Sequence, residues 1–344
     1  MSAGVSIVIC CHNSAPRLPE TLRHLAAQQV PEGIAWEIVI IDNASTDGTA
    51  ETARRCWPET SPAPLRIVQE PRLGVGNARF RSFSEARHEI ISFVDDDNWV
   101  GPDWIENVAD FFQRHPGASA VGGPSRAAFE ATPPKWFSNV SGFYAIGDQH
   151  AFAGDITDQP GTLLWTAGMS LRKEKALELT GNGLGFFSCG GSSLPLKTGE
   201  DTELCFALRA SGGRLHYDPR LVIEHFMPAN RLTWPKALRL LRTMGASSVL
   251  YDLYLIALDV SPFAARPAWK KGWLFYTLKA LRRLAALMLF HPLDCLRRTE
   301  GSAHALDFER TTGQLATLRT LCGRYTKMRD RIRHAPWAQD RNLR

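Results

Sequence analysis

The first hundred residues alternate between short apolar runs and stretches that carry apolar residues at helical spacing. The apolar runs, rich in Val and Ile, occupy residues 5–11, 36–41, 65–68 and 89–97. So high a density of β-branched residues over so few positions is typical of strands buried on both faces of a sheet. Strands that alternate with helices predict an α/β fold with a mostly parallel, doubly wound sheet.

The amino-acid composition changes at two points further along the chain. From about residue 120, glycine and proline become frequent, with a glycine-rich run from 181 to 199. We predict strands at residues 165–172 and 220–226 and a helix that opens at 199 and ends at the glycine pair 212–213. Beyond 230 the chain is helical, aromatic and basic. We therefore expect one domain over residues 1–230, with halves 1–120 and 121–230, followed by a helical region over 231–344.

Three adjacent carboxylates, Asp95, Asp96 and Asp97, end the fourth apolar run. In open α/β sheets, ligands bind at the carboxyl ends of the strands. Carboxylates this close repel one another unless a positive group shares them, and a hard divalent cation such as Mg²⁺ or Mn²⁺ does so commonly. The alternative is an acidic turn that precedes a helix starting near Pro102.

Two further candidates follow the second and third strands. Asp42 at a strand end can accept from a nucleobase N–H or a ribose hydroxyl, or it can form a turn network with Ser45 and Asp47. Arg79 follows the glycine pair at 74 and 76, where a backbone can approach a ligand closely. It can meet a diphosphate, or it can be a solvated arginine.

Glu200 and Asp201 stand at a predicted helix start after the glycine-rich run. Carboxylates are favoured at helix N-termini, so helix capping is one interpretation. A flexible loop that delivers two acids can equally place a general base. His225, in the last predicted strand, is either a metal ligand or an ordinary core histidine.

Composition and charge narrow the class of protein. The net charge of +5 over 344 residues is uneven, because residues 231–300 hold twelve Lys and Arg against four Asp and Glu. This local basicity predicts a surface partner, and we expect no nucleic-acid partner. The seven cysteines show no CxxC spacing, which favours a reducing compartment over a zinc or disulfide scaffold. No signal peptide or membrane span is expected.

Together the motifs resemble family 2 glycosyltransferases of the GT-A fold, over roughly residues 4–235. The segments that carry the resemblance come in the expected order at residues 5–13, 38–48, 74–79, 94–97 and 199–203. The chain departs from the family at Phe80, where many members carry Asn. It also lacks the Gln-x-x-Arg-Trp motif of processive synthases, so we expect a non-processive enzyme.

The resemblance implies an inverting, metal-dependent transferase that moves a sugar from a nucleotide-diphospho-sugar, with a UDP-sugar as the expected donor, to an acceptor hydroxyl. Asp201 would be the general base, with Glu200 beside it. Asp97 would be the main ligand of Mg²⁺ or Mn²⁺, with Asp95 and His225. The implied donor-binding residues are Asn13, Asp42, Arg79, Asp95, Asp96, Trp165, Gly168 and Arg231.

Two other classes remain open on the sequence. A sugar-1-phosphate nucleotidyltransferase would share the sheet and the metal, although residues 11–20 lack the Gly and Lys of its N-terminal loop. The other is an inactive nucleotide-sugar binding protein, against which the retention of both Asp97 and Asp201 speaks.

The basic C-terminal segment predicts a cytoplasmic enzyme bound peripherally to the inner face of the cytoplasmic membrane. Lys279, Arg282 and Arg283 share one helical face, with apolar residues elsewhere on the same helix. Such helices can lie on an anionic bilayer, which would suit a lipid-linked glycan acceptor in cell-surface polysaccharide synthesis. The alternatives are packing on the catalytic domain and a homodimer.

Overall fold

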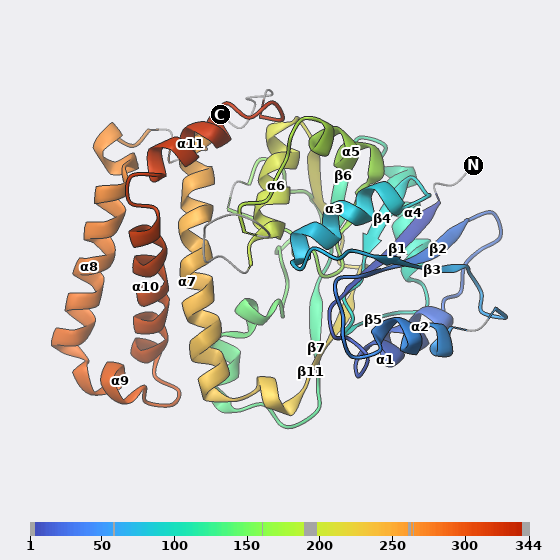
Figure 1. The fold of residues 1–344 in the computed structure, drawn as a ribbon, viewed down its shortest axis with the longest axis horizontal. Coiled ribbons are helices and arrows are strands. Elements are labelled where there is room, and N and C mark those ends of the chain that lie inside the picture. The colour runs from blue at the N-terminus through green and yellow to red at the C-terminus, as the bar shows by residue number, and fades with distance from the viewer. Residues whose placement is uncertain are drawn as a thin grey trace.

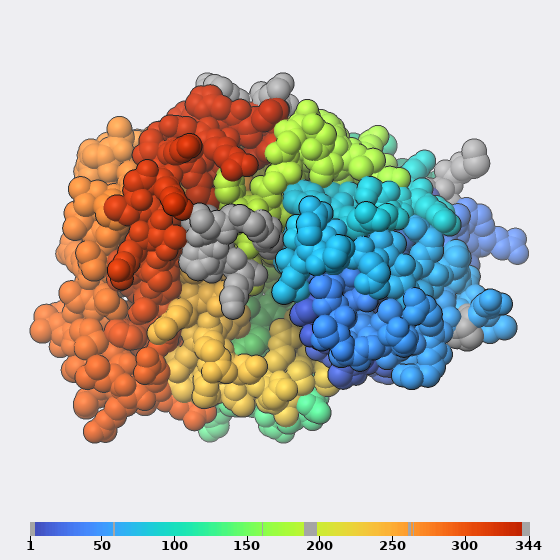
Figure 2. Space-filling model, in the orientation of Figure 1, coloured from blue at the N-terminus to red at the C-terminus, as the bar shows by residue number. Residues whose placement is uncertain are grey.

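A computed structural model of the chain describes residues 4–338 apart from 58, 160, 189–197, 261–262 and 264 (Figure 1). Part of the glycine-rich run noted in the sequence lies outside these residues. The predicted alternation of strands and helices is confirmed. Figure 2 shows the N-terminal part of the chain in blue on one side of the molecule and the C-terminal helices in orange and red on the other.

An eight-stranded sheet forms the centre, in the order β3-β2-β1-β4-β9-β6-β10-β8. Its first four strands run parallel, and β6 and β10 also pair in parallel, whereas β9 and β8 run antiparallel to their neighbours. The strands are β1 (Val5–Cys11), β2 (Trp36–Asp42), β3 (Leu65–Gln69), β4 (Ile90–Phe93), β6 (Ala118–Gly122), β8 (Gly154–Asp155), β9 (Ser170–Arg172) and β10 (Arg214–Tyr217).

Two predicted strands are shorter than the sequence pattern suggested. The fourth ends at Phe93, because the acidic segment turns away and Asn98 Oδ1 accepts a hydrogen bond from the Asp95 backbone N–H at 3.2 Å. The strand predicted at 165–172 is strand only over its last three residues, since Gly168 adopts a φ of 80° just before them. This strand, β9, pairs antiparallel with β4 and β6, whereas the alternation of strands and helices predicted a mostly parallel sheet.

A second, three-stranded sheet has the order β5-β11-β7, from β5 (Asn98–Val100), β7 (Ser125–Phe129) and β11 (Ile223–Met227). His225 pairs with Asn98, and the Phe226 backbone N–H donates to the Asp97 carbonyl at 2.8 Å. This pairing brings the last predicted strand directly against the acidic segment.

Helices cover both faces of the central sheet, because alternate residues of β1 face opposite sides. Ile7 and Ile9 belong to one core cluster and Val8 to the other. The first side is covered by α1 (Leu18–Ala26), α2 (Thr49–Cys56) and α4 (Trp104–Arg114), and the second by α3 (Val75–Glu85), α5 (Lys173–Gly181) and α6 (Glu200–Ala210).

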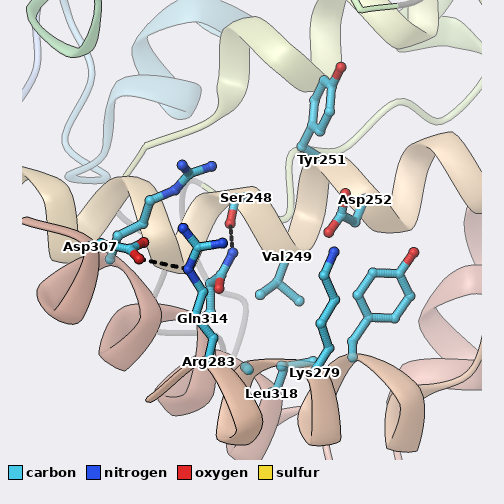
Figure 3. A pocket seen from close by; sticks show the side chains of 12 residues that line it. Ser248, Val249, Tyr251, Asp252, Lys279, Arg283, Asp307, Gln314 and Leu318 are labelled. Atoms are coloured by element: carbon cyan, nitrogen blue, oxygen red, sulfur yellow. Dashed lines mark hydrogen bonds and ion pairs between the residues drawn. The ribbon is translucent and has the colours of Figure 1, made fainter. Parts of the chain in front are cut away.

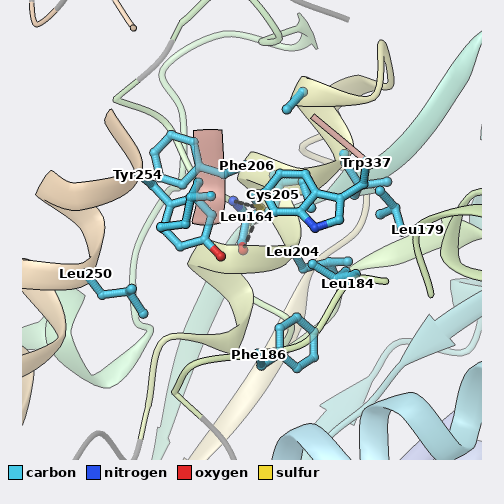
Figure 4. Packing of buried hydrophobic residues seen from close by; sticks show 14 of the residues in the cluster. Leu164, Leu179, Leu184, Phe186, Leu204, Cys205, Phe206, Leu250, Tyr254 and Trp337 are labelled. Atoms are coloured by element: carbon cyan, nitrogen blue, oxygen red, sulfur yellow. Dashed lines mark hydrogen bonds between the residues drawn. The ribbon is translucent and has the colours of Figure 1, made fainter. Parts of the chain in front are cut away.

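The C-terminal helices continue the second core. Leu250 and Tyr254 pack in one cluster with Leu204, Phe206 and Trp337 (Figure 4). In Figure 1, α10 lies between α7 and α8. Within the described ranges, none of the helices combines the length and apolar character that a membrane crossing requires. The helices are α7 (Trp234–Ala257), α8 (Trp273–Phe290), α9 (Pro292–Arg297), α10 (Ala303–Thr320) and α11 (Tyr325–Arg333).

The backbones of α7 and α10 touch through glycine. A Cβ added to Gly245 would lie 1.9 Å from the Arg310 carbonyl oxygen, and one added to Gly313 would lie 1.9 Å from that of Arg242. We expect Gly245→Ala to lower the free energy of unfolding by about 1–3 kcal/mol, because the helices must separate. Urea denaturation of the wild type and the variant measures this difference in the free energy of unfolding.

Gly181→Ala is the matched control for this substitution. Gly181 ends α5, and an added Cβ there meets nothing within 4 Å. Alanine should be neutral or stabilising there, by up to about 1 kcal/mol. Equal effects of the two substitutions would contradict the close helix contact.

Candidate functional site

The candidate site lies at the carboxyl edge of the parallel strands, where the strand order reverses between β1 and β4. Asp42 ends β2 and pairs with Cys11 at the end of β1. β4 ends at Phe93, and the acidic segment follows it directly. Ligands of doubly wound sheets bind at such a switch point. The fold therefore gathers Asp42 and the three acidic residues at one edge.

Asp42 and Asn13 hold the turns of this edge. Asp42 is 4% exposed, and its carboxylate accepts from the Ser45 backbone N–H at 3.2 Å and from Gln69 Nε2 at 2.9 Å. The exposed Asn13 accepts from the Thr46 backbone N–H at 2.8 Å. The turn network is thus present, and donor contacts by Asp42 and Asn13 stay a prediction.

Arg79 lies beneath the edge and not on its surface. Its side chain is 3% exposed, with Nη2 3.1 Å from Asp95 Oδ1 and the guanidinium 4.1 Å from the Phe93 ring centroid. Nε and Nη1 are buried without a hydrogen-bond partner among the described residues. This placement makes Arg79 a support for Asp95, which itself remains 32% exposed.

Asp96 pairs with Arg17, whereas Asp95 pairs with Arg79. Arg17 Nε donates to its Oδ2 at 3.1 Å, and Thr21 Oγ1 donates to its backbone carbonyl at 2.9 Å. Burial, together with the neighbouring charge of Asp97, raises the pKa of Asp96. Asp96 therefore anchors α1 to the edge, and its predicted contact with the donor is untested.

Asp97 meets the two predicted residues that lie farthest away in sequence. Its Oδ2 accepts from Arg231 Nη1 at 2.9 Å, and its Oδ1 lies 3.4 Å from His225 Nε2. Burial raises the pKa of Asp97, but the hydrogen bond with His225 and the charge of Arg231 outweigh it and hold that pKa below its usual range. Asp97 is therefore an anion at neutral pH.

This donor set fits a hard divalent cation. Two carboxylates and an imidazole are ligands that Mn²⁺ accepts, and ligand atoms around an octahedral ion stand about 3 Å apart. The 3.4 Å between Asp97 Oδ1 and His225 Nε2 is close to that spacing. Asp95 keeps a second oxygen beyond the one that faces Arg79. Arg231 holds the other oxygen of Asp97.

The predicted ligands are nevertheless only partly gathered. Among the described residues, the one group of three whose ligand atoms lie within 4.8 Å of one another is His291, Asp294 and His304, in the C-terminal helices. The rings of that pair of histidines stack with centroids 3.4 Å apart and planes 10° apart. The nitrogen lone pairs of the two histidines therefore lie in two nearly parallel planes.

Glu200 and Asp201 open α6, as predicted. The Gly199 backbone N–H donates to Glu200 Oε2 at 3.1 Å, and the Thr202 N–H donates to Asp201 Oδ1 at 2.7 Å. Burial, together with the charge of Glu200, raises the pKa of Asp201 to about 7. Arg79 acts electrostatically on Asp95, Glu200 and Asp201. The charge of Arg79 thus acts both on the acidic segment and on the start of α6.

Glu203 was missed by sequence reasoning. Its buried carboxylate accepts from the backbone N–H groups of Phe187 and Ser188, both at 2.8 Å, and from Tyr254 Oη at 2.9 Å. Burial raises the pKa of Glu203 to about 7. This residue ties the first turn of α6 to α7. The sequence feature that could have indicated Glu203 is a third acidic residue in that turn, on the buried face of the helix.

Gly168 lies next to the end of β4, and Trp165 packs against the core cluster on the α4 side of the sheet. Gly168 is buried, its N–H donates to the Phe93 carbonyl at 3.1 Å, and an added Cβ would be 3.0 Å from Ile223 Cγ2. Glycine is needed there for both φ and space. Trp165 is half-buried, and its N–H donates to Gln149 Oε1 at 2.5 Å. Donor binding by Trp165 and Gly168 stays a prediction.

Comparisons with known proteins identify the family to which the chain is similar. The sequence model described as Glycosyl transferase family 2 matches residues 6–178. The succinoglycan biosynthesis protein ExoM of Rhizobium meliloti is 28% identical over 232 residues, 67% of this chain and 70% of that protein. The glucosyl-dolichyl phosphate glucuronosyltransferase of Haloferax volcanii is 25% identical over 183 residues, 52% of this chain and 55% of that protein.

A solved structure shares the fold. The mannosyltransferase PcManGT from Pyrobaculum calidifontis, in complex with GDP-Man and Mn²⁺, superposes with a TM-score of 0.55 at 21% identity, covering 92% of this chain and 88% of that one. This likeness confirms the predicted GT-A fold.

Proposed function

Because the chain belongs to glycosyl transferase family 2, we propose that it transfers a sugar with inversion from a nucleotide-diphospho-sugar to an acceptor hydroxyl. The observation that carries this proposal is Asp201. A carboxyl with a pKa of about 7 is matched to general-base catalysis at neutral pH. Arg79 links it electrostatically to the acidic segment where the donor would bind.

In this reaction Asp201 takes the proton of the acceptor hydroxyl. The acceptor oxygen attacks the anomeric carbon from the face opposite the nucleotide, while the bond to the diphosphate breaks. Asp95, Asp97 and His225 would hold Mg²⁺ or Mn²⁺, which would neutralise charge on the leaving diphosphate. Asp42 contacts the nucleoside, and Arg79 fixes Asp95 from below.

The two alternative classes gain no support from the comparisons, and one assay separates them from transfer. Purified protein is incubated with UDP- and GDP-sugars, Mn²⁺ and candidate acceptors, and released nucleoside diphosphate is measured. A transferase releases it in proportion to acceptor. A nucleotidyltransferase would release pyrophosphate from a nucleoside triphosphate and a sugar 1-phosphate, and a binding protein would release neither.

The proposed acceptor is a lipid-linked glycan in cell-surface polysaccharide synthesis. The names of two relatives, a succinoglycan biosynthesis protein and a glucosyl-dolichyl phosphate glucuronosyltransferase, support this class of acceptor. The absence of the Gln-x-x-Arg-Trp motif from the sequence supports addition of one sugar at a time.

A surface of the C-terminal helices supports binding to an anionic membrane on its cytoplasmic side. The outward face of α8 and α9, here called the outer apolar face, exposes seven large side chains by 47% to 72%. Arg282 is exposed on α8 beside it. An exposed apolar stripe with flanking cations can lie in the interface of an anionic bilayer. The face comprises Leu274, Leu278, Leu281, Leu289, Phe290, Leu293 and Leu296.

We expect the wild-type protein to sediment with phosphatidylglycerol vesicles, and a Leu278→Glu/Leu289→Glu variant to stay in the supernatant. Both leucines are more than half exposed, so the charges should disrupt membrane contact and not the core. Vesicle sedimentation at low salt measures this.

Leu177→Glu, at a 40% exposed leucine of α5, is the matched control and should still sediment. If wild type ignores the vesicles and elutes as a dimer that the double substitution makes monomeric, the face joins two copies and the membrane proposal fails.

A further inference from the structure

The C-terminal helices form a partly open cavity, lined by polar and apolar side chains, that the proposed transfer reaction does not use. It has a volume of about 260 Å³ and opens between α7, α8 and α10. Figure 3 shows Lys279 and Arg283 rising from α8 toward Ser248 and Asp252 of α7. Arg310 of α10 also lines the cavity. Basic residues from two helices therefore border one cavity.

Among the described residues, only one of these three cations forms an ion pair with an acid. Arg283 Nε donates to Asp307 Oδ2 at 2.7 Å. Within the described part of the chain, the side chains of Lys279 and Arg310 make no hydrogen bond or ion pair. Both residues are exposed on neighbouring helices beside one cavity, and their like charges repel each other, so the arrangement suits an anion between them.

The one remaining acid of the cavity, Asp252, does not cancel this charge fully. Its carboxylate has no hydrogen bond or ion pair among the described residues. Burial raises the pKa of Asp252, whereas the charges of Lys279, Arg266 and Arg310 lower it. The cavity therefore has a surplus of positive charge whether or not Asp252 is ionised.

Neutral hydrogen-bond donors complete the lining. Gln314 Nε2 donates to Ser248 Oγ at 3.0 Å, and the amide has a second N–H. Tyr276 of α8 adds a hydroxyl, which accepts from Arg266 Nη1 at 3.3 Å, whereas the Tyr251 hydroxyl points away from the cavity (Figure 3). A lysine, an arginine and several hydroxyl or amide donors suit the oxygens of a phosphate group better than the two oxygens of a single carboxylate.

We propose that this cavity between α7, α8 and α10 binds a phosphate group, with Lys279 and Arg310 as its charged ligands. The phosphate can belong to a lipid headgroup or to a free, soluble phosphate, and the cavity chemistry is the same for both. The site lies outside the candidate active site and does not depend on the proposed function.

The competing explanation is a solvent-separated pair between Lys279 and Asp252 that only stabilises the helices. The two explanations predict opposite effects of Asp252→Asn. If the cavity binds phosphate, removing this carboxylate removes a repulsive charge and tightens binding by a few-fold. If the residues form a pair, the substitution lowers the melting temperature and changes no phosphate affinity.

Isothermal titration calorimetry of the full chain with inorganic phosphate, in EDTA at constant ionic strength, tests the proposal. We expect saturable binding that weakens at least tenfold in Lys279→Ala and in Arg310→Ala. Arg282→Ala, an exposed arginine on the same helix that does not line the cavity, should bind as wild type. Circular dichroism melts verify that each variant is folded.

A second titration uses short-chain phosphatidic acid below its critical micelle concentration, and the tighter of the two ligands identifies the source of the phosphate. Loss of that binding in Lys279→Ala, with retention in Arg282→Ala, supports the site in either case. Absence of binding by both ligands, or equal binding by wild type and Lys279→Ala, overturns the proposal.

Discussion

Asp201→Asn is expected to lower kcat by at least about 10²-fold while donor affinity stays within about twofold. The amide keeps the size of the side chain and can still accept the Thr202 backbone hydrogen bond seen at 2.7 Å. It cannot take a proton, so the loss measures general-base catalysis alone. Steady-state kinetics and calorimetric titration of the donor separate the two quantities.

The pH profile of the wild type gives the same test without a mutation. The base must be ionised to act, and burial raises the pKa of Asp201 to about 7. We therefore expect kcat/KM to rise with pH through about 7 and to level off above it, a limb that Asp201→Asn should lack.

Glu174→Gln is the matched control for Asp201→Asn, because Glu174 is an acid in the first turn of α5. It should leave kcat unchanged, which separates loss of a base from loss of a favourable helix-end charge. A fall of less than threefold in Asp201→Asn would show that Asp201 serves only the helix end.

The second large effect is expected at Asp97. Asp97→Asn should reduce transfer by about 10²-fold or more and weaken Mn²⁺ binding, because an amide is a poor ligand for a hard cation. The substitution also removes the charge that Arg231 and His225 face at 2.9 and 3.4 Å. Electron paramagnetic resonance of Mn²⁺, with nucleoside diphosphate present, measures ion binding independently of catalysis.

Asp103→Asn is the control for this variant. Asp103 is exposed at the start of α4 and its Oδ2 accepts from Asn107. We expect wild-type transfer and wild-type Mn²⁺ binding. Full activity of Asp97→Asn, or of the wild type in excess EDTA, would contradict a metal-dependent reaction.

Local sequence pattern predicted well those elements whose formation depends on residues close to one another in the sequence. Residues 5–11 form β1, in which alternate side chains pack into the two core clusters on opposite faces of the sheet. The helix start at Glu200 followed from the glycine before it and the acids in its first turn. Both depend on interactions within a few residues, which is the range that a sequence pattern records.

Local pattern did not predict which charged side chains are buried or which residues they bind. The sequence left Arg79 either as a diphosphate contact or as a solvated arginine, and it did not predict that Arg79 is buried under Asp95. It also did not predict that Glu203 would bind Tyr254, 51 residues away. A charged side chain looks the same in a pattern whether it is solvated or paired, because its partner comes from another element.

By itself, the sequence determined the α/β alternation, the acidic segment at a strand end, the helix start with Asp201 and the family resemblance, since local spacing and residue type express all of them. Only the tertiary structure decided that Asp97 meets Arg231 across 134 residues, that β9 runs antiparallel and that α8 leaves an apolar face exposed. These features arise from contacts between distant segments, and the free energy of such contacts depends on how the elements pack.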